Sequence, residues 1–136
     1  MARGTVATPL LAIIHTNDTH GHDVEVKSSD ELEGNFSMAT VAALKADWEA
    51  KGYEVVLVDA GDATQGTPLV DTTLGAPAIA FMNSCGYELM AVGNHEFDWG
   101  VDALVANEKQ ASFPYLSANI LKKDTPLLEG FGVLPG

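Results

Sequence analysis

The sequence contains little cysteine, few basic residues and no long apolar run, and each shortage excludes a class of protein. Cys85 is the only cysteine, so no disulfide can form within the chain, and its apolar neighbours predict a buried thiol. No stretch approaches the ~20 apolar residues of a membrane-spanning helix. Residues 10–14 are apolar but too few for the core of a signal peptide. The sequence therefore predicts no transmembrane segment.

Acidic residues outnumber basic residues by 19 to 7, which gives a formal net charge of −12. Such a charge opposes binding to the phosphates of a nucleic-acid polymer, and we expect no such partner. The same negative charge also repels small phosphate esters, unless cations are bound where the ester binds. Two divalent ions would supply about +4 of local charge. Small anionic substrates and bound metal ions are therefore expected together or not at all.

The remaining composition predicts a single α/β domain. The chain has 136 residues, 46% of them hydrophobic and 19% charged, which is typical of a globular protein and not of a disordered one. Strands are predicted from four apolar runs, at residues 9–16, 54–59, 88–92 and 114–119. The first of these runs is continuous and rich in β-branched residues, which predicts a strand buried on both faces.

Helices are predicted between these strands. Ser37 can cap a helix that Gly52 ends, Pro77 can open a second helix that ends near Gly86, and Val101 begins the apolar face of a third. Strands that alternate with helices of this length indicate βαβ units with parallel strands. The irregular parts are expected to be linker or added residues at 1–8, a solvated loop at 21–35 and a tail at 122–136.

Polar side chains follow the first three predicted strands, at the point where each strand ends. Asp18 and His20 follow the first, Asp62 the second, and Asn94 and His95 the third. Because ligands bind at the carboxyl ends of the strands in parallel sheets, we expect these side chains to converge. Alone, Asp62 is also compatible with a turn or a helix cap. Together, the oxygen and nitrogen atoms of these residues predict a metal centre.

The residue sequences of these motifs resemble those of the calcineurin-like metallophosphoesterases. The residues that carry the resemblance are HTNDTHG at 15–21, DAGDATQGTP at 59–68, GNHEFDWG at 93–100 and SAN at 117–119. They are most similar to the bacterial branch of 5′-nucleotidases, UDP-sugar hydrolases and 2′,3′-cyclic phosphodiesterases. The resemblance implies a four-layer α/β/β/α domain, of which residues 1–136 would form the N-terminal half. It also implies a periplasmic, secreted or cell-surface location.

The resemblance further implies a role for each candidate residue. Asp18 and His20 would bind one divalent metal ion, Asp62 would bridge two ions, and Asn94 would bind the second. Mixed oxygen and nitrogen ligands suit Mn, Zn or Fe. The two ions would activate a water molecule that attacks the phosphorus of a small phosphate ester, most simply a nucleotide.

Two further residues complete the implied catalytic group. His95 would contact the substrate together with Asn94, and it would stabilise the developing charge or protonate the leaving group. Asp98 would orient the imidazole ring of His95.

The remaining polar and aromatic residues near the motifs are predicted to be supporting. Glu96 is expected to hold its loop by hydrogen bonds, and His15 to be a hydrogen-bonded structural histidine. His22 is expected near the site but outside the metal ligands. Phe97 and Trp99 are expected to pack and stiffen the loop.

No histidine follows His95, whereas the family has further histidine ligands downstream. The sequence therefore predicts an incomplete site, weak or absent activity of the chain alone, and self-association or pairing with the missing half of the domain. Two alternatives remain open. One is a non-catalytic metal-binding or interaction fragment. The other is a cyclic-nucleotide phosphodiesterase, a nucleotide-sugar hydrolase or a sulfur-ester hydrolase with the same core.

Overall fold

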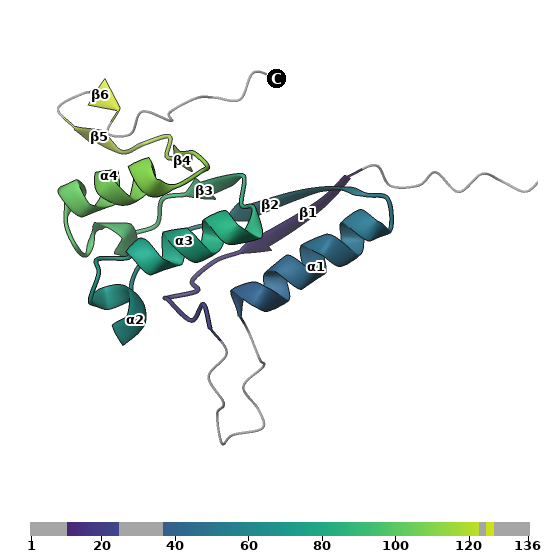
Figure 1. Cartoon of the computed structure of the whole chain (residues 1–136). Helices are drawn as coiled ribbons and strands as arrows, with labels where there is room; N and C mark the ends of the chain where they lie inside the picture. Colours follow the sequence, from purple (N-terminus) through teal and green to yellow (C-terminus); the bar gives the residue numbers. More distant parts are fainter. Residues whose placement is uncertain (1–10, 25–36, 123–124, 127–136) are drawn as a thin grey trace, which may run out of the picture.

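A four-stranded parallel sheet forms the centre of the fold (Figure 1). The structure, a computed structural model of the chain, describes residues 11–24, 37–122 and 125–126. The strands lie in chain order across the sheet and are β1 (Leu11–Thr16), β2 (Glu54–Asp59), β3 (Leu89–Ala91) and β4 (Tyr115–Leu116). In the register of the first pair, Ile13 lies beside Val56 and Thr16 beside Asp59. The predicted parallel α/β class is confirmed.

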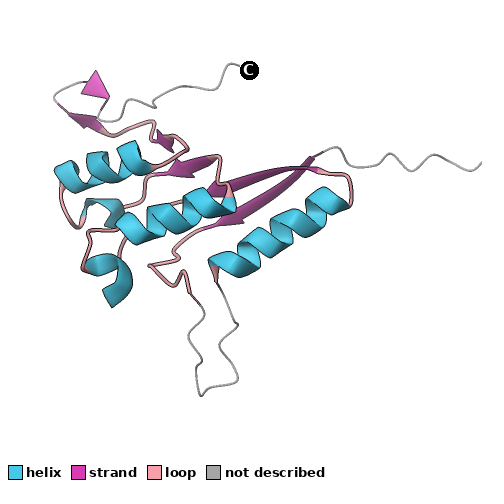
Figure 2. Ribbon diagram, in the orientation of Figure 1, coloured by secondary structure: helices cyan, strands magenta, loops and turns pink. Residues whose placement is uncertain are grey.

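Helices connect consecutive strands and lie over one face of the sheet (Figures 1 and 2). In chain order they are α1 (Met38–Ala50), α2 (Pro68–Asp71), α3 (Ala76–Cys85), the 3₁₀ helix η1 (His95–Phe97) and α4 (Val101–Gln110). Ser37 caps α1 as predicted, because its side chain accepts a hydrogen bond from the backbone N–H of Thr40. Gly86 ends α3 with a φ of 72°, a conformation that favours glycine. No helix in the described ranges is long and apolar enough to cross a membrane.

The hydrophobic core lies between the sheet and these helices. Leu57, Met90 and Tyr115 project from three neighbouring strands and are fully buried. They pack in one cluster with Ile79 and Met82 of α3. Cys85 is buried in the same cluster, as predicted, and its thiol lies 3.2 Å from the backbone oxygen of Met38. Close packing on the helix-covered face of the sheet holds the ends of the strands in fixed positions.

The prediction that the first strand is buried on both faces is wrong. β1 is an edge strand, and its residues alternate between exposed and more buried positions. The side chains of Leu11 and Ile13 are 50% and 66% exposed, because the helices lie over the opposite face of the sheet. A continuous apolar run thus forms a strand that is covered on one side only.

Several predicted boundaries also change. β3 and β4 have three and two residues, shorter than the runs at 88–92 and 114–119. Two short helices, α2 and η1, stand where loops were expected. A small antiparallel pair, β5 (Leu121–Lys122) with β6 (Thr125–Pro126), extends into the expected irregular tail at 122–136. Residues 1–10 and most of the segment 21–35 lie outside the described residues.

Asp23 belongs to the expected solvated loop but is only 2% exposed. Neither of its carboxylate oxygens has a hydrogen-bond partner within the described part of the chain. Burial raises the pKa of this carboxyl group to about 6, although the nearby His22 opposes the shift. The folded protein therefore binds this proton more tightly than the unfolded chain does, so its stability should fall as pH rises from about 4 to about 6.

We accordingly expect Asp23→Asn to stabilise the protein by about 2 kcal/mol at neutral pH and to have little effect below about pH 4. Urea unfolding across this pH range measures the difference. Asp102→Asn at an exposed position of α4 is the matched control and should change the free energy of unfolding little. Equal curves for wild-type protein and Asp23→Asn at neutral pH would contradict this account.

Candidate metal centre

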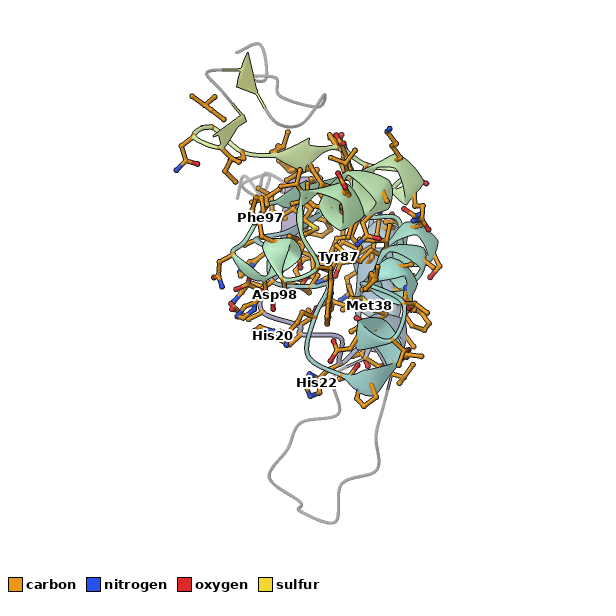
Figure 3. The ribbon with its side chains drawn as sticks, turned by 90° about the vertical axis from the view of Figure 1, so that its left-hand side faces the viewer. His20, His22, Met38, Tyr87, Phe97 and Asp98 are labelled. Atoms are coloured by element: carbon orange, nitrogen blue, oxygen red, sulfur yellow. The ribbon has the colours of Figure 1, made fainter. Side chains whose placement is uncertain are left out.

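The candidate site lies at the carboxyl ends of β1, β2 and β3, the end of the molecule that faces the viewer in Figure 3. Backbone hydrogen bonds join the loops that follow β1 and β2. The N–H groups of Asp18, His20 and Gly21 donate to the carbonyl oxygens of Gly61, Asp62 and Ala63 over 2.9, 3.0 and 3.2 Å. The first two polar motifs are therefore held side by side, as convergence at one sheet edge requires.

Three candidate ligands have an unusual backbone conformation. Asp18, His20 and Asp62 have φ values of 52°, 48° and 61°, and the described residues include only one other non-glycine residue of this kind, Leu74. The left-handed region costs energy for residues with a Cβ atom and persists where surrounding contacts impose it, often at functional sites. The three side chains thus take directions that an ordinary extended or helical loop would not give them.

Two glycines let the third loop sit against the second. A Cβ atom on Gly61 would lie 2.6 Å from the backbone nitrogen of Gly93, and a Cβ atom on Gly93 would overlap the carboxylate of Asp62. Gly61 also has a φ of 104°. Because neither position has room for a methyl group, backbone meets backbone here. This contact brings the loop of Asn94 and His95 up to Asp62.

Glu96 connects these two loops from inside the protein. Its carboxylate is 2% exposed and accepts hydrogen bonds from the N–H groups of Gly93, Asp62 and Ala63 over 2.7, 2.9 and 2.9 Å. The N–H and the hydroxyl of Thr64 donate to it over 3.3 Å each. Supporting hydrogen bonds were expected of Glu96 within its own loop. The structure shows that most of them reach the loop after β2.

Asp59 is a buried carboxylate to which the sequence analysis gave no role. It accepts hydrogen bonds from the Thr16 hydroxyl over 2.5 Å and from the N–H of Gly61 over 2.7 Å. The Tyr87 hydroxyl lies 2.8 Å from that of Thr16. Burial raises the pKa of Asp59 to about 6, and the bonds from Thr16 and Gly61 oppose the shift. The feature of the sequence that could have drawn attention to Asp59 is its place three residues before Asp62, in the same motif.

The side chains of His20, Asp62 and His95 form a group that could hold a metal ion. One ligand atom from each lies within 4.8 Å of the others. The N–H of His95 donates to Asp62 Oδ1 over 2.8 Å, and the rings of His20 and His95 lie 5.1 Å apart, centroid to centroid. Asp18 lies outside this group, although its Oδ1 is 3.8 Å from His20 Nε2. Asn94 is exposed and directly precedes η1.

His95 is paired with Asp98, whose side chain is labelled in Figure 3. His95 Nδ1 lies 2.8 Å from Asp98 Oδ2. This hydrogen bond is the main cause that raises the pKa of the His95 imidazole. Desolvation opposes the rise, and the charges of Asp98, Asp62 and Glu96 add to it. A carboxylate at Nδ1 leaves Nε2 as the ring atom that can face a ligand.

The other two histidines are placed differently from these. His22 Nδ1 lies 3.0 Å from the carbonyl oxygen of Thr19, and His22 is not in the metal-binding group. His15 is exposed on β1, on the face of the sheet that the helices leave uncovered, and its role as a hydrogen-bonded structural histidine stays a prediction.

The aromatic residues of the third loop pack as predicted. The side chain of Phe97 lies against the core cluster, and the indole N–H of Trp99 donates to the carbonyl oxygen of Thr64 over 3.3 Å. Trp99 therefore adds another link between the loops after β2 and β3.

The donor set fits a divalent cation. Imidazole nitrogens and carboxylate oxygens bind Mn, Zn and Fe. Among the described residues, no lysine or arginine forms an ion pair with a carboxylate of the site, since Lys45 pairs with Glu88 and Lys51 with Asp47. In the described ranges, therefore, no lysine or arginine balances the negative charge of the site. The structure thus defines an α/β protein with a parallel sheet and a candidate metal site at the carboxyl ends of its strands.

Comparison with known proteins identifies the family of this chain. Residues 11–136 match the model of the calcineurin-like phosphoesterase family. The chain belongs to the calcineurin-like phosphoesterase family. It is 40% identical over 119 residues to a 5′-nucleotidase of Vibrio cholerae, covering 85% of this chain and 21% of that protein. It is 44% identical over 119 residues to a snake venom 5′-nucleotidase of Gloydius brevicauda, covering 83% of this chain and 20% of that protein.

Solved structures show the same likeness. The crystal structure of a 5′-nucleotidase precursor from Thermus thermophilus superposes with a TM-score of 0.74 and 35% sequence identity. The match covers 88% of this chain and 24% of that one. The chain thus spans about a fifth of the length of the curated relatives it matches.

Proposed function

We propose that the protein hydrolyses phosphate esters of nucleotides and uses two divalent metal ions to do so. The observation that carries this proposal is the convergence of His20, Asp62 and His95, whose ligand atoms lie within 4.8 Å of one another, in a chain of the calcineurin-like phosphoesterase family. The relatives named 5′-nucleotidase support a nucleoside 5′-monophosphate as the substrate.

In this proposal, Asp18 and His20 would hold one ion, Asp62 would be a ligand of both ions, and Asn94 would hold the second. The carboxylate of Asp62 has two oxygens, so it can serve two ions at once. When bound, such ions polarise the phosphoryl group and activate the attacking water. Mn, Zn or Fe would suit the oxygen and nitrogen atoms of these residues.

His95 supplies the proton-handling group next to these ligands. With Asp98 2.8 Å from Nδ1, the protonated imidazole presents Nε2–H to a phosphoryl oxygen or to the leaving group. The raised pKa of His95 favours this protonated form. Asn94 is proposed to contact the substrate beside it. Asp98 acts by orienting the ring, and Glu96 by holding the loop. A periplasmic, secreted or cell-surface location is proposed from the family resemblance.

Phosphate release from a nucleoside 5′-monophosphate tests the function. We expect phosphate release by the chain to require Mn²⁺ and to disappear with a chelator. Asp62→Asn should also remove it, because one of the two carboxylate oxygens is replaced by an amide nitrogen that cannot bind a metal. Release that persists in the chelator contradicts the proposal. Calorimetric Mn²⁺ binding without any release favours a non-catalytic metal-binding role.

We also propose that the chain self-associates through the uncovered face of its sheet. Leu11 and Ile13 expose apolar side chains there, and exposed apolar patches favour association. Ile13→Glu should lower the mass measured by light scattering. Leu69→Glu, at an exposed leucine of α2 away from the sheet, should leave that mass unchanged. A wild-type chain that stays monomeric at every concentration contradicts this proposal.

A further inference from the structure

We infer that Gln65 is a positioning residue that fixes the tautomer of His20 and thereby decides which ring nitrogen is available to a metal ion. The inference deepens the proposed function and rests on it for the role of the metal. The tautomer itself is a property of the metal-free protein. Gln65 lies in the loop between β2 and α2, within the 59–68 motif, and the sequence analysis gave it no role of its own.

The contact that carries the inference joins His20 Nδ1 to Gln65 Oε1 over 3.3 Å. The amide presents its oxygen to the ring, and an amide oxygen only accepts hydrogen bonds. The contact is therefore a hydrogen bond when Nδ1 carries the proton of the neutral ring. His20 Nε2 then keeps its lone pair. In metal sites, a hydrogen bond to one ring nitrogen fixes the tautomer and orients the other nitrogen toward the ion.

The free nitrogen lies on the side of the candidate ligands. His20 Nε2 is 3.8 Å from Asp18 Oδ1. The ring of His20 stands edge-on to that of His95, with an angle of 73° between their planes. The tautomer set by Gln65 therefore places a lone pair, and not a proton, toward the side chains proposed to hold an ion.

The segment around Gln65 is itself held against the turn that carries His20. The Thr67 hydroxyl donates to the carbonyl oxygen of Gly21 over 2.9 Å. A Cβ atom on Gly66 would lie 2.6 Å from the carbonyl oxygen of His20 and 2.8 Å from its Cβ atom, so the two backbones are in close contact. The N–H of Gly66 donates to Asp71 Oδ1 over 2.8 Å and ties the segment to α2. Gln65 thus approaches the ring from a fixed backbone.

His22 provides an internal reference for this inference. Its Nδ1 faces the carbonyl oxygen of Thr19 at 3.0 Å. A backbone carbonyl oxygen, like the amide oxygen of Gln65, can only accept a hydrogen bond. His22 should therefore have the same Nδ1–H tautomer, but for a reason that does not involve Gln65. A change at position 65 should alter His20 and leave His22 unchanged.

The experiment is a long-range proton–nitrogen NMR correlation on the metal-free chain with ¹⁵N-labelled histidine, at alkaline pH where the rings are neutral. In the wild type we expect a protonated Nδ1 and an unprotonated Nε2 at His20. Gln65→Met keeps the length of the side chain but has no amide, so the Nε2–H tautomer of His20 should appear. Gln65→Glu keeps an acceptor and should retain Nδ1–H. Gln110→Met, at an exposed position of α4, is the matched control.

A calorimetric titration with Mn²⁺ alone gives the second readout. Loss of a hydrogen-bond partner behind a ligating histidine weakens metal binding about 10- to 100-fold. We expect this loss for Gln65→Met and an affinity near the wild-type value for Gln110→Met. An Nε2–H tautomer in the wild type, or an unchanged tautomer in Gln65→Met, overturns the inference. If the tautomer behaves as expected but no phosphate is released, the proposed function fails and the inference stands.

Discussion

Replacing His95 by alanine should slow metal-dependent phosphate release about 10²- to 10⁴-fold, the usual contribution of a general acid or base. The expectation follows from the position of the ring. His95 is held by Asp98 at Nδ1 and by the bond from its own N–H to Asp62 Oδ1, so its side chain lies next to a proposed ligand that both ions would share. No other histidine of the described residues is paired with a carboxylate at hydrogen-bond distance.

Initial rates at saturating metal measure this effect. His22→Ala is the matched control, because His22 belongs to the same group of loops but bonds to Thr19 and lies outside the metal-binding group. Its rate should stay near that of the wild type. Comparable rates for His95→Ala and His22→Ala would remove His95 from the mechanism.

Asp98→Asn separates orientation from proton transfer. The hydrogen bond and charge of Asp98 raise the pKa of His95, so the neutral amide should lower it. If the protonated ring assists the reaction, activity falls as pH rises through this pKa. The alkaline fall in rate should therefore move to lower pH in Asp98→Asn, and an unmoved profile would argue against the protonated form.

Replacing Glu96 by alanine should destabilise the folded protein by at least about 3 kcal/mol. The change leaves four backbone N–H groups and the Thr64 hydroxyl without their acceptor in a buried position. Each unsatisfied buried group costs about 1–3 kcal/mol, although water can enter the space and reduce the sum. Urea unfolding measures the effect.

Glu96→Gln is the sharper variant because it changes one atom. Oε1 accepts from Ala63 and Thr64, and Oε2 accepts from Asp62 and Gly93. An amide can keep only one of these oxygens, and its NH₂ group would face N–H donors in place of the other. We expect a loss of about 2 kcal/mol. Glu49→Gln at an exposed position of α1 should cost less than about 0.5 kcal/mol. Equal unfolding midpoints for the two variants would contradict the role of Glu96.

The sequence predicted the order of strands and helices because local signals mark them. The apolar runs, the capping Ser37 and the terminating Gly86 act within a few residues of where they stand. The gathering of Asp62 and His95 at one edge was also predictable, since polar residues at the ends of parallel strands share that edge.

What could not be predicted depends on neighbours that are distant in sequence. An apolar run such as 11–16 has the same composition whether one face or both are covered, so the exposure of Ile13 and His15 followed only from the placement of the helices. Glu96 bonds to residues 32–34 positions away, and no periodicity records such contacts. The bond between His20 and Gln65 spans 45 positions and was missed for the same reason.

The contact between Gly61 and Gly93 limits how this protein can change over evolutionary time. When two side chains meet, enlargement of one can be compensated by a smaller residue at the other. Here a new Cβ atom on Gly61 would meet the backbone nitrogen of Gly93, which every amino acid possesses. No second substitution at position 93 can therefore restore the fit. Adaptation to other substrates has to proceed in the parts of the chain that surround these two loops, while the two glycines stay in place.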